Sequence, residues 1–156
     1  DELRAYSSAS PAQAFRKAME DARAVAARVG LAFRPYPLES REMAVCDLNP
    51  LKILFVSADG RVSPCVYTSL AGQSEIPRFF EGRSVSVPAV HFGNVGEKPL
   101  MEIWDLPEYR AFRRQFVNRL VGAKAMALSA VRGKRAAEEE APAPEPCRTC
   151  PKLYGL

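Results

Sequence analysis

The sequence has a single histidine, a single tryptophan and no long apolar run. A helix that crosses a membrane needs about 20 consecutive apolar residues, and no segment approaches that length. A secretory signal would begin with basic residues followed by an apolar stretch, whereas this chain opens with Asp-Glu-Leu-Arg. We therefore expect a soluble, cytoplasmic protein without a membrane partner.

Glycine and proline are also too scarce for a fibrous or low-complexity chain, with 9 and 13 residues. The length of 156 residues, with 47% hydrophobic and 26% charged residues, is typical of one globular domain with an appendage. A chain of roughly 150 residues buries about 70% of the surface that it exposes when unfolded. Such a domain does not need disulfides for its stability.

Charge of one sign is not dominant, because 22 basic residues face 18 acidic ones and the net charge is +4. A basic run could suit nucleic acid or an acidic partner. It comprises Arg110, Arg113, Arg114, Arg119, Lys124, Arg132, Lys134 and Arg135. Three consecutive glutamates at 138–140 balance this run. We expect a solvated helix face, or a surface that docks on another part of the protein, and no nucleic-acid partner.

The N-terminal segment predicts a helix that runs into a strand. Ser10 is a suitable N-cap, Pro11 suits the first helical position, and Gly30 stands where a left-handed C-terminal cap would fall. The apolar stripe of this helix consists of Phe15, Met19, Ala22, Ala26 and Val29. Residues 31–37, LAFRPYP, then predict an extended segment that its prolines end.

A β-hairpin follows, with strands expected at 52–56 and 61–66. The dipeptide Asp59-Gly60 between them is a strong turn signal, and Gly60 supplies the positive φ that a tight turn needs. Pro64 cannot donate a ladder hydrogen bond, so we expect the second strand to be an edge strand or to bend near Cys65.

The rest of the chain predicts a loop, a long helix and a connector. Residues 67–99 show no sustained period and read mostly as loop, with one short strand in SVSVPAV. Beyond them, apolar residues at helical spacing predict a two-part helix that is broken at Pro107. We expect the helix to continue through 123–140, where good helix formers are present without a regular apolar stripe. Residues 141–146, APAPEP, predict a stiff, polyproline-like connector.

The four cysteines are the chemically distinctive residues, because thiols in a reducing compartment usually bind metal or do redox work. Cys147 and Cys150 form a Cys-x-x-Cys pair, whose spacing lets two thiolates of one turn face the same metal centre. Cys46 and Cys65 flank the hairpin, which folds its two ends together. If the C-terminal tail crosses that end, four thiolates meet there.

Several chemistries suit such a set. Four thiolates can hold a zinc ion or an iron–sulfur cluster. A zinc ribbon usually has two Cys-x-x-Cys knuckles, whereas here one pair is split across the hairpin, which argues against a ribbon. Two disulfides are disfavoured by the compartment. The remaining alternative is four buried cysteines that act only as small apolar side chains.

Two other residues are weaker candidates. His91 is the single histidine and could carry protons, but its place beside Phe92 and Gly93 in a loop is more typical of a structural residue. Trp104, next to Ile103, is expected in the core. The sequence therefore offers no catalytic residue.

The cysteine spacing resembles a known family. CDLNPLKILFVSADGRVSPC is similar to the opening of the SPASM and twitch domains, which follow the catalytic core of radical S-adenosylmethionine (radical SAM) enzymes. In that pattern a cysteine, about a dozen residues, a glycine, four residues and a second cysteine follow one another; Cys46, Gly60 and Cys65 match it. HFGNVGEKPLMEIWDLPEYRAFRRQF resembles the family's next segment, and CRTC its late Cys-x-x-Cys.

The resemblance implies a compact α+β fold with an N-terminal helix, a β-hairpin, a helical segment and a cysteine-bearing tail. It implies that Cys46, Cys65, Cys147 and Cys150 hold one auxiliary [4Fe–4S] cluster, which serves electron transfer during a radical modification by an oxidoreductase. A full SPASM domain has seven cysteines and two clusters, and a further cysteine would stand at position 156, which is Leu156 here. The twitch version, with one cluster, is the better match.

The resemblance also divides the chain. Residues 1–40 would connect to a radical SAM barrel, 41–120 with 147–156 would form the cluster domain, and 121–146 would be a helical extension and a Pro-rich linker. The Cys-x-x-x-Cys-x-x-Cys loop that binds S-adenosylmethionine is absent from this sequence. We expect that cofactor only in a core elsewhere in a full-length chain, and no activity of this chain alone.

The resemblance leaves two points open. The substrate would be a peptide or a small metabolite. The alternative function is a non-catalytic zinc-binding interaction module. The tail has few apolar residues, so we expect residues 138–156 to depend on a bound metal centre for their order.

Overall fold

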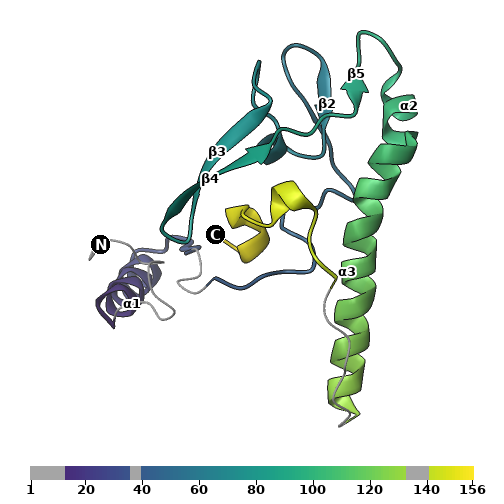
Figure 1. Ribbon diagram of the computed structural model, residues 1–156. Helices are drawn as coiled ribbons and strands as arrows, with labels where there is room; N and C mark the ends of the chain where they lie inside the picture. The colour runs from purple at the N-terminus through teal and green to yellow at the C-terminus, as the bar shows by residue number, and fades with distance from the viewer. Residues whose placement is uncertain (1–12, 36–39, 133–140) are drawn as a thin grey trace.

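Short antiparallel strands follow one another between the N-terminal helix and the later helices, so the fold is α+β, as the sequence predicts. The computed structural model describes residues 13–35, 40–132 and 141–156 (Figure 1). In chain order the elements are α1 (Gln13–Arg28), β1 (Phe55–Val56), β2 (Arg61–Ser63), the 3-10 helix η1 (Val66–Thr68), β3 (Glu75–Phe80), β4 (Arg83–Pro88), β5 (Gly93–Asn94), α2 (Leu100–Asp105), α3 (Pro107–Val131) and the 3-10 helices η2 (Glu145–Cys147) and η3 (Pro151–Tyr154).

The long helix α3 runs along one side of the molecule, directly after the short helix α2 (Figure 1). The predicted break is confirmed: Leu106 adopts non-helical angles, and Pro107 opens α3 at a position where its missing N–H removes no helical hydrogen bond. The helix continues to Val131, which confirms its extension as far as the structure describes it. Tyr109 and Phe116 of α3 are fully buried.

The predicted hairpin is present and belongs to a three-stranded sheet in the order β1-β2-β5. Gly60 has φ +82° in its turn, as expected. The second strand ends at Ser63, just before Pro64, because proline has no N–H to continue the ladder. Of the two alternatives expected for this strand, the edge position is not realised, since β2 pairs with both β1 and β5 and is the central strand. The alternative, a bend near Cys65, is confirmed, because the chain bends at Pro64 and Cys65.

A second hairpin, β3–β4, occupies the region expected to be mostly loop. The short strand predicted there is confirmed as β4, but the loop prediction for Glu75–Phe80 is wrong. Pro77 interrupts the sequence signal of β3, yet the strand tolerates it because it belongs to a two-stranded ribbon and has a free edge. Pairing along six residues of each strand then defines the ribbon.

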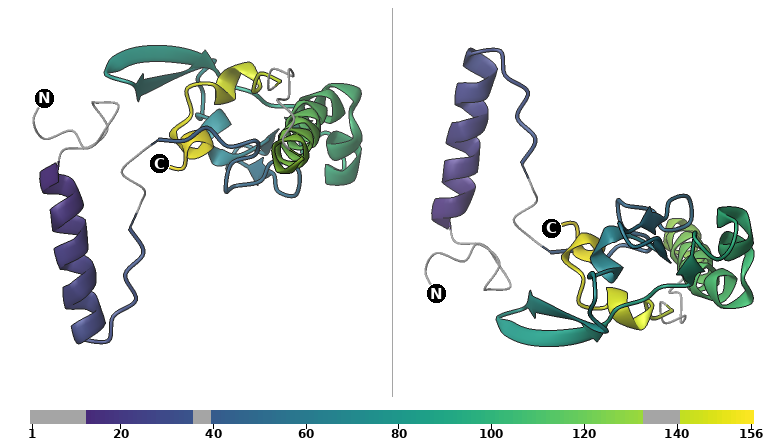
Figure 2. Two further views of the ribbon diagram at one scale, coloured as in Figure 1. Left: turned by 90° about the horizontal axis from the view of Figure 1, so that it is seen from below. Right: turned by 90° about the horizontal axis from the view of Figure 1, so that it is seen from above.

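The N-terminal helix α1 stands apart from the cysteine-bearing body in both views of Figure 2. Gly30 has φ +74°, which confirms the predicted left-handed cap, whereas the expected N-cap residues Ser10 and Pro11 lie outside the described residues. Residues 31–35 form no strand, so that prediction is wrong for them, and 36–39 lie outside the described part. No helix among the described residues is long and apolar enough to cross a bilayer.

The C-terminal tail packs against the core rather than forming a free connector. Pro144 has polyproline-like angles, φ −50° and ψ 141°, as expected, but Ala143 and Pro144 are buried. Phe112, Phe116, Cys147 and Leu153 form one core cluster with Ala143. The tail therefore packs beside α3, a contact that the sequence did not predict.

Candidate metal centre

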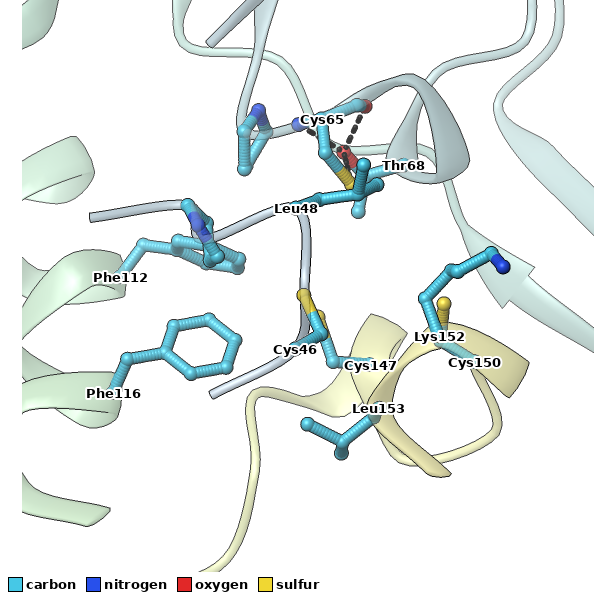
Figure 3. A pocket seen from close by; sticks show the side chains of 12 residues that line it. Cys46, Leu48, Cys65, Thr68, Phe112, Phe116, Cys147, Cys150, Lys152 and Leu153 are labelled. Carbon is cyan, nitrogen blue, oxygen red and sulfur yellow. Dashed lines mark hydrogen bonds between the residues drawn. The ribbon is translucent and has the colours of Figure 1, made fainter. Parts of the chain in front are cut away.

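All four cysteines line one small pocket, shown in Figure 3. Cys46 lies in the loop before β1, Cys65 follows β2, and Cys147 and Cys150 lie in the tail. The convergence that the sequence predicts is thus present. All four are free thiols, so the disulfide alternative is not realised.

The walls of this pocket are almost entirely apolar. Phe112 and Phe116 project into it from α3 (Figure 3). The remaining apolar lining consists of Leu48, Pro50, Pro64 and Leu153. Thr68 and Lys152 are its polar residues apart from the cysteines. A centre bound here would be shielded from water on most sides.

Burial in these surroundings disfavours the charged thiolate. Desolvation raises the pKa of the Cys46, Cys65 and Cys147 thiols, and the charges of the neighbouring cysteines raise these pKa values further. Raised pKa values favour the neutral thiols, so a metal centre that binds them as thiolates displaces their protons. The site is therefore electrostatically suited to a cationic centre that releases protons as it binds.

The donor set of this pocket fits two kinds of metal centre. Four thiolates are soft ligands that hold a zinc ion or an iron–sulfur cluster. Among the residues that the structure describes, no three or more His, Cys, Asp or Glu side chains are grouped to hold a metal ion. The four thiols therefore line one pocket as separate donors.

Cys65 is oriented by the 3-10 turn that follows it. The Thr68 hydroxyl donates to the Cys65 carbonyl at 2.8 Å and accepts from the Cys65 N–H at 3.3 Å. The same hydroxyl lies 3.8 Å from Cys65 Sγ, and Thr68 is 1% exposed (Figure 3). The turn therefore directs this sulfur into the pocket and places a hydroxyl beside it.

Cys147 and Cys150 lie on successive tight turns. The Cys147 N–H donates to the Pro144 carbonyl at 2.8 Å, and the Cys150 N–H donates to the Cys147 carbonyl at 3.0 Å. The Leu153 N–H in turn donates to the Cys150 carbonyl at 2.9 Å. The Cys-x-x-Cys motif thus presents both sulfurs from one compact coil.

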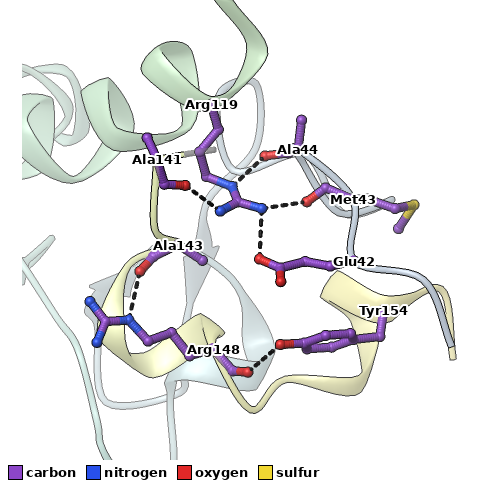
Figure 4. Close-up of polar contacts among 8 residues, drawn as sticks. All are labelled: Glu42, Met43, Ala44, Arg119, Ala141, Ala143, Arg148 and Tyr154. Atoms are coloured by element: carbon purple, nitrogen blue, oxygen red, sulfur yellow. Dashed lines mark hydrogen bonds and ion pairs between the residues drawn. The ribbon is translucent and has the colours of Figure 1, made fainter. Parts of the chain in front are cut away.

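Arg119 of α3 connects two of the cysteine-bearing segments (Figure 4). Its guanidinium donates to the carbonyls of Met43 and Ala44, each at 3.1 Å, and to the Ala141 carbonyl at 2.5 Å. It also pairs with the Glu42 carboxylate at 2.7 Å. These contacts join the chain before Cys46 and the chain before Cys147 to the same helix.

The burial of Arg119 contradicts the expectation that this residue lies with the basic run on a solvated or docking face. The residue is 1% exposed and follows Phe116 by three positions, so it continues the buried stripe of α3. That spacing was the available signal. A buried guanidinium was not expected because its acceptors are carbonyls from distant segments, which no local pattern reveals.

The weaker candidates stay outside the site. His91 is exposed and does not line the pocket. Trp104 is half-buried, packs edge-on against Tyr109 with ring centres 5.2 Å apart, and carries the Arg113 guanidinium 3.9 Å above its ring. The core position predicted for Trp104 is confirmed by these contacts.

Comparison with known families decides what kind of domain this is. The family model for SPASM, described as an iron–sulfur cluster-binding domain, matches residues 46–151 and therefore more than half of the chain. The chain belongs to the SPASM family. The matched region of this SPASM domain begins at Cys46 and ends just after Cys150, so it contains all four cysteines.

A curated relative covers part of this SPASM domain. The tungsten-containing aldehyde ferredoxin oxidoreductase cofactor-modifying protein of Pyrococcus furiosus is 38% identical over 79 residues, which are 51% of this chain and 21% of that protein. The chain thus spans about a fifth of the length of this relative. No solved structure matches the chain.

Proposed function

We propose that Cys46, Cys65, Cys147 and Cys150 bind one [4Fe–4S] cluster. The observation that carries this proposal is the convergence of all four thiols, from separate segments, on one apolar pocket in a SPASM domain. Soft thiolate donors are the ligands that such clusters use.

We further propose that the cluster serves electron transfer. A cluster held by four cysteines has no iron site left for substrate, and it supplies one-electron chemistry when bound. The chain contributes the enclosure: Phe112, Phe116 and Leu153 keep water from the sulfurs, and Thr68 places one hydroxyl beside Cys65. Burial and hydrogen bonds to sulfur are the features that set the reduction potential of such centres.

The resemblance to radical SAM enzymes extends the proposal to the whole protein. The electron-transfer domain would work beside a radical SAM core that lies outside this sequence and binds S-adenosylmethionine there. The name of the Pyrococcus furiosus relative, a cofactor-modifying protein, supports a small metabolite as substrate over a peptide. Four free thiols suit a reducing cytoplasm.

Anaerobic reconstitution tests the cluster assignment. Wild-type chain incubated with iron and sulfide without oxygen should bind about four of each and develop broad visible absorption. Cys46→Ser and Cys147→Ser should bind much less of both, whereas His91→Ala, which alters an exposed side chain away from the pocket, should load like wild type. Stoichiometric zinc without sulfide in protein prepared anaerobically would instead support the zinc-binding module.

A further inference from the structure

The β3–β4 hairpin lies along the C-terminal tail in both views of Figure 2. Side chains alternate along β3, so that Ile76, Arg78 and Phe80 are half-buried while Pro77 and Phe79 are exposed. The half-buried face of the strand is the one that meets the body of the domain. Arg78 is the charged residue on this face, and it calls for an explanation because charged side chains are rarely placed inward without partners.

Arg78 has partners in two segments that carry cysteines. One guanidinium nitrogen donates to the Pro146 carbonyl, and the other donates to the Tyr67 carbonyl. Pro146 directly precedes Cys147, and Tyr67 lies two residues after Cys65. The planar, two-armed guanidinium can hold both carbonyls at once, which a lysine ammonium on a single flexible stem does less well.

A second contact joins the hairpin to the same tail. The Phe80 ring packs on the Tyr154 ring with centres 4.9 Å apart. Tyr154 in turn donates from its hydroxyl to the Arg148 carbonyl at 2.7 Å, between the two tail cysteines. The hairpin thus touches the tail on both sides of the Cys-x-x-Cys motif.

We propose that the β3–β4 hairpin is a latch for the cluster site, in which Arg78 is the positioning residue that keeps Cys65 and Cys147 at a fixed separation. The proposal rests on the cluster assignment above. Cys65 and Cys147 are far apart in the sequence, and among the described contacts Arg78 bonds directly to the backbone beside each. Without that bridge, the two ligand segments can separate and open the pocket to water, chelators and oxygen.

The chain offers a matched set of variants. Arg78→Ala removes the bridge and the charge. Arg78→Lys keeps the charge but loses the planar guanidinium whose two nitrogens bond to the two carbonyls. Arg83→Ala removes an exposed arginine of the same hairpin that faces solvent on β4. Each reconstituted variant is challenged anaerobically with an iron chelator, and cluster loss is followed by visible absorption. Thermal unfolding and circular dichroism are measured on the same samples, and the reduction potential by a titration followed by electron paramagnetic resonance.

If the latch acts as proposed, Arg78→Ala loses its cluster about tenfold faster or more, as is typical when an outer residue that orients metal ligands is removed. Its potential shifts to a more negative value, since a nearby positive charge favours the reduced cluster. Arg78→Lys keeps the wild-type potential but still loses its cluster faster, and Arg83→Ala matches wild type in both. If Arg78→Ala does not fold, the faster loss in folded Arg78→Lys carries the test.

The outcomes separate the two proposals. Equal rates of cluster loss in Arg78→Ala and Arg83→Ala overturn the latch and leave the cluster assignment intact. An Arg78→Lys variant that retains its cluster as long as wild type also overturns it, because charge alone would then suffice. A wild-type chain that takes up no iron and sulfide overturns both.

Discussion

The helices α1 and α3 have similar apolar stripes in the sequence but different surroundings in the structure. Tyr109 and Phe116 of α3 are fully buried, whereas in α1 only Ala26 is buried and Phe15 and Met19 are half-exposed. An apolar stripe indicates that a helix has a partner. The stripe does not show whether that partner belongs to the same chain.

The partner of α3 is the cysteine site itself. Its inner face supplies Phe112 and Phe116 to the pocket wall and Arg119 to the segments before Cys46 and Cys147. The described part of the chain offers no comparable cover for α1, which stands away from the body in Figure 2. A lone helix of this length is only marginally stable in water. The prediction that residues 1–40 connect to a barrel outside this sequence would account for its stripe.

The largest difference between the two helices is expected when one aromatic residue is truncated in each. Phe116→Ala should lower the free energy of unfolding by about 3–5 kcal/mol, because it leaves a cavity in a packed core. Phe15→Ala should lower it by less than about 1 kcal/mol, as surface substitutions do. Chemical denaturation measures both. Similar losses in the two variants would mean that α1 is packed as firmly as α3.

Removing one cation from each helix should give a smaller difference in the free energy of unfolding. Arg119→Met leaves a carboxylate and three carbonyls without their buried donor, and should cost about 3 kcal/mol. Lys17→Met breaks an exposed i,i+4 pair with Asp21, 2.8 Å long, and should cost about 0.3–0.5 kcal/mol. Thermal or chemical unfolding compares them. An Arg119→Met protein as stable as Lys17→Met would show that the carbonyl contacts contribute little.

The smallest difference is expected from one substitution made at two glycines. Gly60→Ala should cost about 1–3 kcal/mol, because φ is +82° there and the new Cβ would lie 2.4 Å from Asn94 Oδ1. Gly30→Ala has the same backbone strain, with φ +74° and open space around it. Its effect should be confined to the helical signal of α1 in circular dichroism. A shift of the main unfolding transition in Gly30→Ala would contradict the independence of α1.

Local features of this fold were predictable because nearby residues dictate them. The turn at Asp59-Gly60 and the helix break at Pro107 follow from the φ that glycine and proline allow. The spacing of Cys147 and Cys150 placed both on one coil, as the structure has it. The family pattern also identified all four cysteines as the candidate ligands.

Longer-range features could not be predicted because the residues that produce them lie in segments far apart in the sequence. The hairpin β3–β4 depends on pairing between strands in which Pro77 obscures the alternation. The burial of Ala143 depends on the apolar side of α3, whose Phe112 and Phe116 share its core cluster. Arginine is usually exposed, so nothing in the sequence marks Arg78 or Arg119 as part of the site. Their bonds to backbone carbonyls of distant segments place them there.

The kind of donor could be predicted from the chain alone: four soft thiols, two in a Cys-x-x-Cys motif and two on either side of a hairpin. How these donors are held is a property of the folded molecule. Arg119 on α3 bonds to the chain before Cys46 and before Cys147, and Arg78 on β3 bonds to carbonyls near Cys65 and Cys147. Thiol chemistry belongs to single residues, whereas a hydrogen bond between distant segments forms only once the chain has folded.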